Sequence, residues 1–273
     1  MNEHVAANHR NWQDRAALHA SDPTGAYRIA DVVAGRSCLH RLEAAELGPL
    51  AGCRVAHLQC HIGLDTISLA HLGAAEVVGL DFSDVALAAA RGFAARAGRS
   101  VQFVESDVYA AREALDGSFD RVFVTWGAIP WLPDIGRWAA VVASLLRPGG
   151  QLYLAETHPF AACLDLVDGR IVPTFPWRTA PDAPIRFDEP TTYTGDPRPI
   201  ANPINYGWNH SLTDILGGLR RAGLTVERFT EHELLPYHLF PTMVPAPGEG
   251  PTMYELPPDV PRFPLSFSLT ATR

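Results

Sequence analysis

The sequence predicts an α/β fold with a doubly wound, mostly parallel sheet. Short apolar runs such as "RVAHL" (54–58) and "AEVVGLD" (75–81) alternate with segments of helical periodicity. That alternation is typical of parallel sheets covered by helices on both faces. Hydrophobic residues make up 47% of the 273 residues and charged residues 19%, which indicates a soluble protein with a sizeable core.

The elements follow in a regular order up to residue 157. After the first strand comes a helix that ends at Gly73, and Ser83 caps the next helix. Apolar periodicity and turn residues set the remaining boundaries. Strands are expected at 54–58, 75–81, 101–107, 119–126, 151–157, 225–234 and 262–273, and helices at 64–73, 83–98, 134–150 and 211–224.

Two regions fall outside this alternation. The helical periodicity of residues 1–50 predicts an N-terminal helical cap, interrupted by a turn-rich connection at 21–33. The main domain is expected over 51–273. Residues 158–209 are rich in Pro, aromatic and turn residues and show no long periodic segment. Such a stretch is usually a functional loop or lid, so we expect an acceptor-site insertion there.

Charge and composition narrow the class of function. A net charge of −8 disfavours nucleic acid as a partner. No apolar run reaches the roughly 18 residues of a membrane span, and no signal-peptide core is apparent, so we expect a cytoplasmic protein. The four cysteines have no CxxC spacing, and no metal site is predicted.

Acidic residues stand at the ends of the second and third strands. Asp81 follows the loop "HLQCHIG" (57–63) by about twenty residues, where a carboxylate can accept hydrogen bonds from ribose hydroxyls. Asp107 is placed to read an adenine amino group. Asp81 and Asp107 could each also be a helix cap. The loop after the first strand, followed by an acid after the second strand and another after the third, nevertheless favours a nucleoside site.

These segments resemble the class I S-adenosylmethionine-dependent methyltransferases. "VVGLDFSDVALAAAR", "FVESDVY", "LLRPGGQLYLAET" and "RRAGLTVERF" resemble later family motifs, from about residue 50 to the C-terminus. The first motif resembles a variant of a bacterial subgroup, LQCHxGLDT. The resemblance implies a Rossmann-like sheet of seven strands with the last strand antiparallel, and S-adenosyl-L-methionine as cofactor, with S-adenosyl-L-homocysteine as product.

The resemblance also implies the cofactor contacts. They are His57, Gln59, His61, Gly63, Asp81, Phe82, Ser106, Asp107, Val108 and Thr125. Gln59 and His61 replace glycines that adopt positive φ, so we expect a rebuilt turn, supported by side-chain hydrogen bonds from Gln59, His61 or Asp65. We expect Gly63 to keep the backbone close to the methionine part. A dehydrogenase would need G-x-G-x-x-G at this loop, which is absent.

The acceptor segment "TWGAIPWLPD" (125–134) lacks the Asn/Asp-Pro-Pro-aromatic tetrad of enzymes that methylate nucleobase or glutamine amino groups. Aromatic residues suggest an apolar or aromatic acceptor pocket, although each is also explained by core packing. The candidates are Trp126, Trp131, Tyr206, Trp208 and Tyr237. Tyr237 lies on a loop with Glu233 and His238 that would wall the cavity or join copies in a homo-oligomer.

Three residues are candidates for orienting or deprotonating the acceptor. His210 precedes the last helix, His158 follows the fifth strand, and Tyr27 lies in the N-terminal turn that would cover the sulfonium end of the cofactor. Histidine suits proton removal near neutral pH, but a loop histidine is more often a structural hydrogen bonder.

The sequence therefore predicts a methyltransferase that acts on a small aromatic or heteroaromatic metabolite, phenol- or indole-like, on O, N or C. Two alternatives stay open. The altered loop would also suit a protein that binds S-adenosylmethionine or S-adenosylhomocysteine without catalysis. The other alternative is a methyltransferase whose acceptor is a protein.

Overall fold

The computed structural model describes residues 3–273, which are organised around one sheet with the strand order β10-β13-β5-β4-β1-β2-β3. Strand β13 runs antiparallel to both of its neighbours, and the other four pairings are parallel. This confirms the predicted fold. The strands are β1 (Arg54–Leu58), β2 (Glu76–Asp81), β3 (Gln102–Glu105), β4 (Phe119–Thr125), β5 (Leu146–Thr157), β10 (Thr225–His232) and β13 (Ser266–Thr272).

Strand β1 is buried on both faces because helices cover the sheet on both sides. Ala56 and Leu58 belong to one apolar cluster, and Val55 belongs to a second cluster on the opposite face. This follows from the two-residue period of a strand. Parallel strands covered on both sides read as continuous apolar runs, which is why the sequence revealed them.

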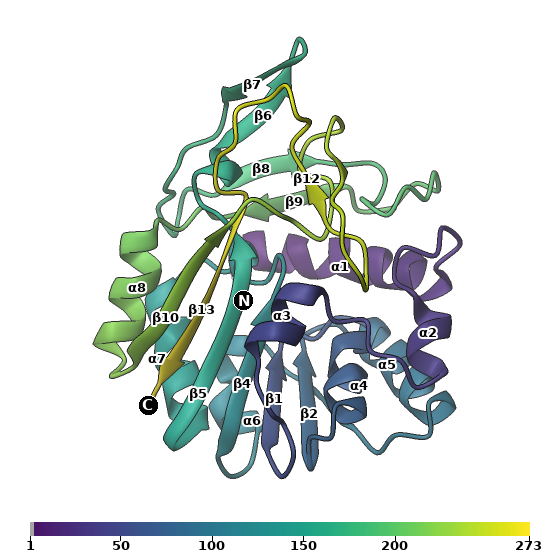
Figure 1. The fold of residues 1–273 in the computed structure, drawn as a ribbon, viewed down its shortest axis with the longest axis vertical. Coiled ribbons are helices and arrows are strands. Elements are labelled where there is room, and N and C mark those ends of the chain that lie inside the picture. Colours follow the sequence, from purple (N-terminus) through teal and green to yellow (C-terminus); the bar gives the residue numbers. More distant parts are fainter. Residues whose placement is uncertain (1–2) are drawn as a thin grey trace.

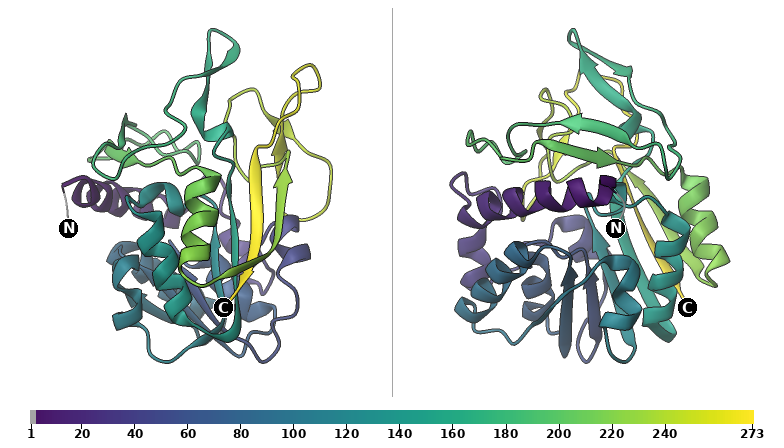
Figure 2. Two further views of the ribbon diagram at one scale, coloured as in Figure 1. Left: turned by 90° about the vertical axis from the view of Figure 1, so that its left-hand side faces the viewer. Right: turned by 180° about the vertical axis from the view of Figure 1, so that it is seen from behind.

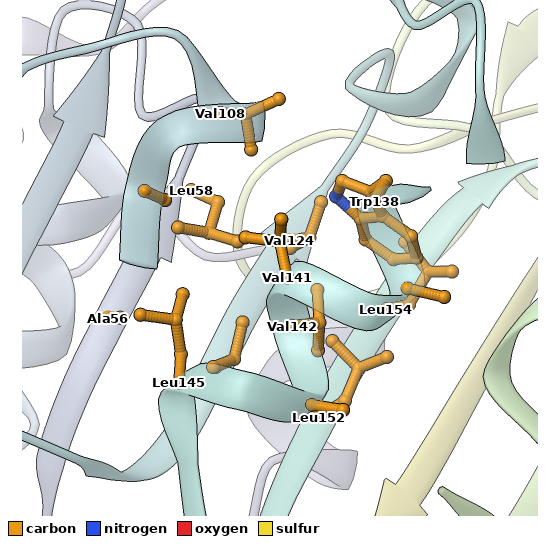
Figure 3. Packing of buried hydrophobic residues seen from close by; sticks show 14 of the residues in the cluster. Ala56, Leu58, Val108, Val124, Trp138, Val141, Val142, Leu145, Leu152 and Leu154 are labelled. Atoms are coloured by element: carbon orange, nitrogen blue, oxygen red, sulfur yellow. The ribbon is translucent and has the colours of Figure 1, made fainter. Parts of the chain in front are cut away.

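One face is covered by α6 (Ala111–Ala114), α7 (Ile135–Leu145) and α8 (Leu212–Arg221). Figure 3 shows the side chains of α7, with Trp138 and Val142 among them, packed against strand residues such as Leu152 and Leu154. Helix α8 begins at a capping box, in which Ser211 and Asp214 bond to each other's backbone N–H.

The other face is covered by α3 (Arg41–Glu46) and α4 (Leu64–His71), with α5 (Asp84–Arg96) beside them. The Ser83 hydroxyl accepts a hydrogen bond from the Ala86 N–H, as the predicted cap requires. Apolar residues of this layer, such as Leu69, pack on Val55 and Phe123 of the sheet.

Above the carboxyl ends of the strands lies a second layer (Figures 1 and 2). Helix α1 (Glu3–Ser21) crosses this end of the sheet, and the insertion lies over α1. The layer also holds the pairs β6–β7 (Leu164–Val167, Arg170–Pro173), β8–β9 (Ile185–Asp188, Ile204–Gly207) and β11–β12 (Val244–Pro245, Tyr254–Glu255). Helix α2 (Ile29–Val33) packs beside α4 and α5. In the part of the chain described, no helix has the length and apolarity that crossing a membrane requires.

Three local predictions were wrong. Helix α7 ends at Leu145 rather than at residue 150, because Leu146 already pairs with Phe119 and Pro148 cannot continue a helix. Residues 29–33 form α2 instead of a turn. The insertion holds two hairpins, whose strands pair with partners that a local pattern does not reveal.

Candidate functional site

The loop after β1 keeps a backbone that is typical of glycine. Gln59 has a φ of 56° and His61 a φ of 52°, both in the left-handed region, and Gly63 follows with 74°. The expected change of the backbone was therefore wrong, because two side-chain-bearing residues adopt the strained conformation themselves, whereas the side-chain hydrogen bond expected from Gln59 is present. Trp126, at the end of the adjacent strand β4, also has a positive φ of 48°. Backbone strain of this kind gathers at functional sites.

Side chains hold the strained loop in place. The Gln59 amide Nε2 donates to the Ala128 carbonyl at 2.7 Å. Below the loop, the fully buried His57 ring lies 2.9 Å from the Thr66 hydroxyl, and burial lowers its pKa to about 3. His57 thus supports the loop from within the core. A Cβ on Gly63 would lie 2.7 Å from both Ala90 and the Phe103 ring, so this glycine is needed for packing as well as for its φ.

Asp81, at the end of β2, fastens the same loop. Its Oδ2 accepts a hydrogen bond of 2.8 Å from the His61 N–H, and its Oδ1 accepts one of 2.9 Å from the Ser83 N–H. Burial raises the pKa of this carboxyl to about 6. A carboxylate has about four lone-pair sites, so two accepted bonds leave capacity for the hydroxyls of a sugar.

The end of β3 lies beside that of β2. The Ser106 N–H donates to the Asp81 carbonyl at 2.9 Å, and Asp107 Oδ1 accepts from the Tyr109 N–H at 2.8 Å. Asp107 therefore caps the short helix η1 (Val108–Ala110), which is the helix-cap role given above as the other explanation of this residue. Val108 is buried in the core, and its contacts are apolar.

Helix α1 covers the ends of β2 and of the loop after β1. Its His9 ring nitrogen lies 3.2 Å from the Phe82 carbonyl, and Gln13 bonds to both Ser83 and Asp84. Its opposite side is bound to the insertion, where Asn8 exchanges hydrogen bonds with the Tyr206 backbone. The helix is thus held between the sheet and the insertion, above the proposed cofactor edge (Figure 2).

Aromatic rings from distant segments meet over His61. The Trp12 ring stacks on the His61 ring at 5.0 Å and on the Trp131 ring at 5.1 Å, with interplanar angles of 23° and 30°. Tyr27 lies 5.4 Å from His61 between ring centroids. We call this group the aromatic cluster; its members are Trp12, His19, Tyr27, His61, Trp131 and Tyr193.

Hydrogen bonds link the polar members of the aromatic cluster. His19 Nδ1 lies 3.0 Å from His61 Nε2 and 2.9 Å from the Tyr27 hydroxyl, which in turn lies 2.7 Å from the Tyr193 hydroxyl. The other His19 nitrogen bonds to the Thr192 hydroxyl. Burial lowers the pKa of His19 to about 2 and that of His61 to about 3, so both rings are neutral at pH 7.

The predicted acceptor residues lie in different places. Trp131 and Tyr27 belong to the aromatic cluster, and Tyr206 contacts the His4 ring of α1. Trp208 is buried and donates to the Pro181 carbonyl, as expected of core packing. Two others lie at strand ends: Trp126 donates to Glu43 and Tyr237 bonds to the Thr157 hydroxyl.

The structure does not bring His158 or His210 to the aromatic cluster. His158 Nδ1 accepts from the Phe160 N–H, and its Nε2 lies 3.1 Å from Glu231 on the edge strand β10. His210 is buried with its Nε2 2.8 Å from the Leu132 carbonyl, and it lines a small pocket with Glu156 and Trp208. Both rings already have structural partners.

Sequence reasoning missed Trp12 and His19 as site residues. Trp12 and His19 lie at helical spacing within the predicted N-terminal cap, and that spacing indicates only the face of a helix. Tyr193 lies in the 158–209 segment, whose composition alone does not distinguish it from the other aromatic residues there. Among residues 3–273, no group of three His, Cys, Asp or Glu side chains is arranged to hold a metal ion.

Comparison with protein families adds to this geometry. Residues 55–150 match the family model described as a methyltransferase domain. The chain is 36% identical over 112 residues to a ubiquinone biosynthesis O-methyltransferase of Ralstonia nicotianae, covering 40% of this chain and 45% of that protein. A protein of the same name from Aromatoleum aromaticum is 34% identical over 111 residues, or 40% and 46% of the two chains. The chain thus matches about half the length of these curated relatives.

Solved structures share the fold over most of the chain. An S-adenosylmethionine-dependent methyltransferase from Mesorhizobium loti superposes with a TM-score of 0.57 at 20% identity, covering 85% of this chain and 96% of that one. A glycopeptide N-methyltransferase complexed with S-adenosyl-L-homocysteine superposes with a TM-score of 0.53 at 22% identity, covering 85% and 87%.

Proposed function

We propose that the protein is an S-adenosylmethionine-dependent methyltransferase that methylates a small aromatic or heteroaromatic metabolite, phenol- or indole-like, on O, N or C. The match of residues 55–150 to a methyltransferase domain and the shared fold support this proposal. We also propose that it belongs to the bacterial subgroup whose first motif reads LQCHxGLDT. The methyl donor would be S-adenosyl-L-methionine, whose sulfonium supplies an activated methyl group when bound.

The residues at the strand ends fit such a donor. Asp81 has remaining acceptor capacity for ribose hydroxyls, and Asp107 stands beside it for the adenine edge. The Gln59 side-chain oxygen is buried and has no hydrogen-bond partner among the described residues. A buried oxygen without a donor is uncommon in native structures and favours a ligand that supplies one.

The aromatic cluster is the observation that carries the proposed acceptor class. Rings from α1, the loop after β1, the segment after β4 and the insertion meet beside the proposed donor loop. Flat rings stack favourably on one another and on flat ligands.

Within the aromatic cluster, Tyr27 and His19 are proposed to orient the acceptor. Burial raises the pKa of Tyr27 well above its ordinary value, so its hydroxyl stays protonated and acts as a donor. His19 is neutral and has a nitrogen 2.9 Å from that hydroxyl. Both nitrogens of His19 already have hydrogen-bond partners, so we propose that His19 positions the Tyr27 hydroxyl rather than removing a proton from the acceptor.

A direct assay tests the proposal. The purified protein is incubated with S-adenosylmethionine and, separately, with phenols, catechols, indoles, aliphatic amines and an unfolded protein, and S-adenosylhomocysteine and methylated products are quantified by mass spectrometry. We expect turnover with one of the aromatic sets. Turnover confined to aliphatic amines or to protein would overturn the acceptor class.

The alternative of binding without catalysis predicts a different result. It requires S-adenosylhomocysteine or S-adenosylmethionine to bind while every acceptor set gives no product. The altered loop was the feature that favoured this alternative, and its glycine-like backbone now weakens it. A protein acceptor is disfavoured because α1 and the insertion together cover the carboxyl ends of the strands (Figure 1).

A further inference from the structure

Buried polar side chains also gather outside the aromatic cluster, at the place where α3 and α4 meet the end of β4. Glu43 of α3 is 1% exposed, and its Oε1 accepts from the Trp126 indole at 2.5 Å. Asp65, in the first turn of α4, has its Oδ2 3.5 Å from the Thr125 hydroxyl and its Oδ1 3.1 Å from the Cys38 thiol. Two buried carboxyl groups therefore stand beside the end of β4.

Several polar atoms of this region have no partner. Glu43 Oε2, His40 Nδ1 and Gln59 Oε1 are buried and make no hydrogen bond within residues 3–273. The three residues come from three segments: α3, the residue before it, and the loop after β1, the strand adjacent to β4. Native structures pair nearly all such atoms, and those left unpaired call for an explanation.

The charge of this region favours a cation. Burial raises the pKa of Glu43 to about 6, and burial followed by the charge of Glu43 raises the pKa of Asp65. Burial lowers the pKa of His40 to about 4, so this ring brings no positive charge at pH 7. Two carboxylates without a cation are unfavourable in the interior, and a positively charged group between them would relieve both.

The hydrogen-bond partners of Glu46 indicate a structural role, whereas those of Glu43 leave one of its oxygens unexplained. Glu46 lies one turn further along α3 and bonds to the Tyr153 hydroxyl at 3.1 Å and to Arg228 at 3.3 Å. Those contacts already hold α3 against the sheet. Glu43 keeps one oxygen for Trp126 and leaves the other unused, which is typical of a group that faces a ligand.

We propose that Glu43 and Asp65 bind the α-ammonium group at the amino-acid end of the methyl donor and its product, with His40 Nδ1–H donating to the α-carboxylate. This inference rests on the proposed function. It extends the donor site beyond the loop after β1 to α3, a segment that sequence reasoning assigned only to the N-terminal cap. The α-amino-acid end is the part of the donor that carries both an ammonium group for these carboxylates and a carboxylate that can accept from the His40 N–H.

Equilibrium binding tests the proposal without any need for turnover. Isothermal titration calorimetry compares S-adenosylhomocysteine with 5′-methylthioadenosine, which keeps the adenosine and the thioether but lacks the amino-acid end. Glu43→Gln and Asp65→Asn should each weaken S-adenosylhomocysteine binding by about 10- to 100-fold, the usual effect of losing a hydrogen bond between charged groups. Binding of 5′-methylthioadenosine should change by less than about 2-fold. Glu46→Gln is the matched control and should leave both affinities unchanged.

Each other outcome has a definite meaning. Equal losses for the two ligands would show a structural role and overturn the proposal, and so would unchanged affinities. If a variant fails to fold, the wild-type protein is titrated with the S-adenosylhomocysteine analogue that lacks the α-amino group. That analogue should bind about 10-fold or more weakly, and equal binding would overturn the proposal. A wild-type protein that binds neither nucleoside would instead contradict the proposed function.

Discussion

The Asp81 carboxylate accepts a hydrogen bond of 2.8 Å from the His61 N–H, and so joins the end of β2 to the loop after β1. The same carboxylate accepts from the Ser83 N–H at the start of α5. One side chain therefore holds the loop and faces the place proposed for the ribose. Loss of its charge would affect both functions.

Asp81→Asn should weaken S-adenosylhomocysteine binding by about 10- to 100-fold, because an amide keeps the shape but presents an N–H to a backbone N–H donor. Calorimetric titration measures the effect. Asp116→Asn is the control, since Asp116 is exposed at the opposite end of the sheet. Affinity equal to that of the wild-type protein would remove Asp81 from the donor site.

The left-handed backbone at Gln59 gives a prediction about stability. Gln59→Gly and Gln59→Ala both lose the hydrogen bond to the Ala128 carbonyl, but only glycine adopts a φ of 56° without a steric cost. The glycine variant should be more stable than the alanine variant by about 1 kcal/mol. Urea unfolding of the pair gives the difference. If alanine proves equally stable, the loop does not hold this conformation in solution.

The parts of the fold that the sequence predicted are those with a strong local signal. The strand containing Val55 to Leu58 and the cap at Ser83 depend on neighbours close in sequence, so periodicity and capping chemistry reveal them. The strand from Ile185 to Asp188 pairs with Ile204 to Gly207 across a loop, and its short polar-apolar pattern has no local signature. Tertiary pairing decides such segments.

The same distinction applies to the candidate site. Asp81 could be found because a carboxylate at a strand end has a position fixed by the sheet. Trp12 and His19 depend on how α1 docks, which is set by contacts such as that between Asn8 and Tyr206, 198 residues apart. The positive φ of His61 could not be expected either, because its steric cost is offset by the bond to Asp81 and by ring stacking.

Trp12 gives a prediction about how the donor site opens. Its ring lies between His61 and Trp131 and holds α1 over the loop, so Trp12→Ala removes two stacking contacts. S-adenosylhomocysteine should then dissociate about 10-fold faster, given the usual strength of aromatic pairs. Stopped-flow displacement measures the rate. Trp177→Ala is the control, since the Trp177 side chain is 62% exposed on the insertion. An unchanged rate would mean that α1 does not limit release.

His57 gives a prediction about pH. Burial keeps the ring neutral in the folded protein, with a pKa of about 3, whereas in the unfolded chain its pKa is near 6.5. Between these values the unfolded state binds one proton more, so His57 makes the free energy of unfolding fall as the pH falls below about 6.5. This proton makes the wild-type protein's stability depend on pH.

The variant His57→Gln can keep a hydrogen bond to Thr66 but lacks the titrating imidazole. From pH 7 to pH 5 the wild-type protein should therefore lose about 2 kcal/mol more stability than the variant, as measured by urea unfolding. His19 and His61 act in the same direction and Asp81 and Glu43 in the opposite one, but these groups are present in both proteins and cancel in the difference. Parallel pH curves for the two proteins would show that His57 is protonated or exposed in the folded state.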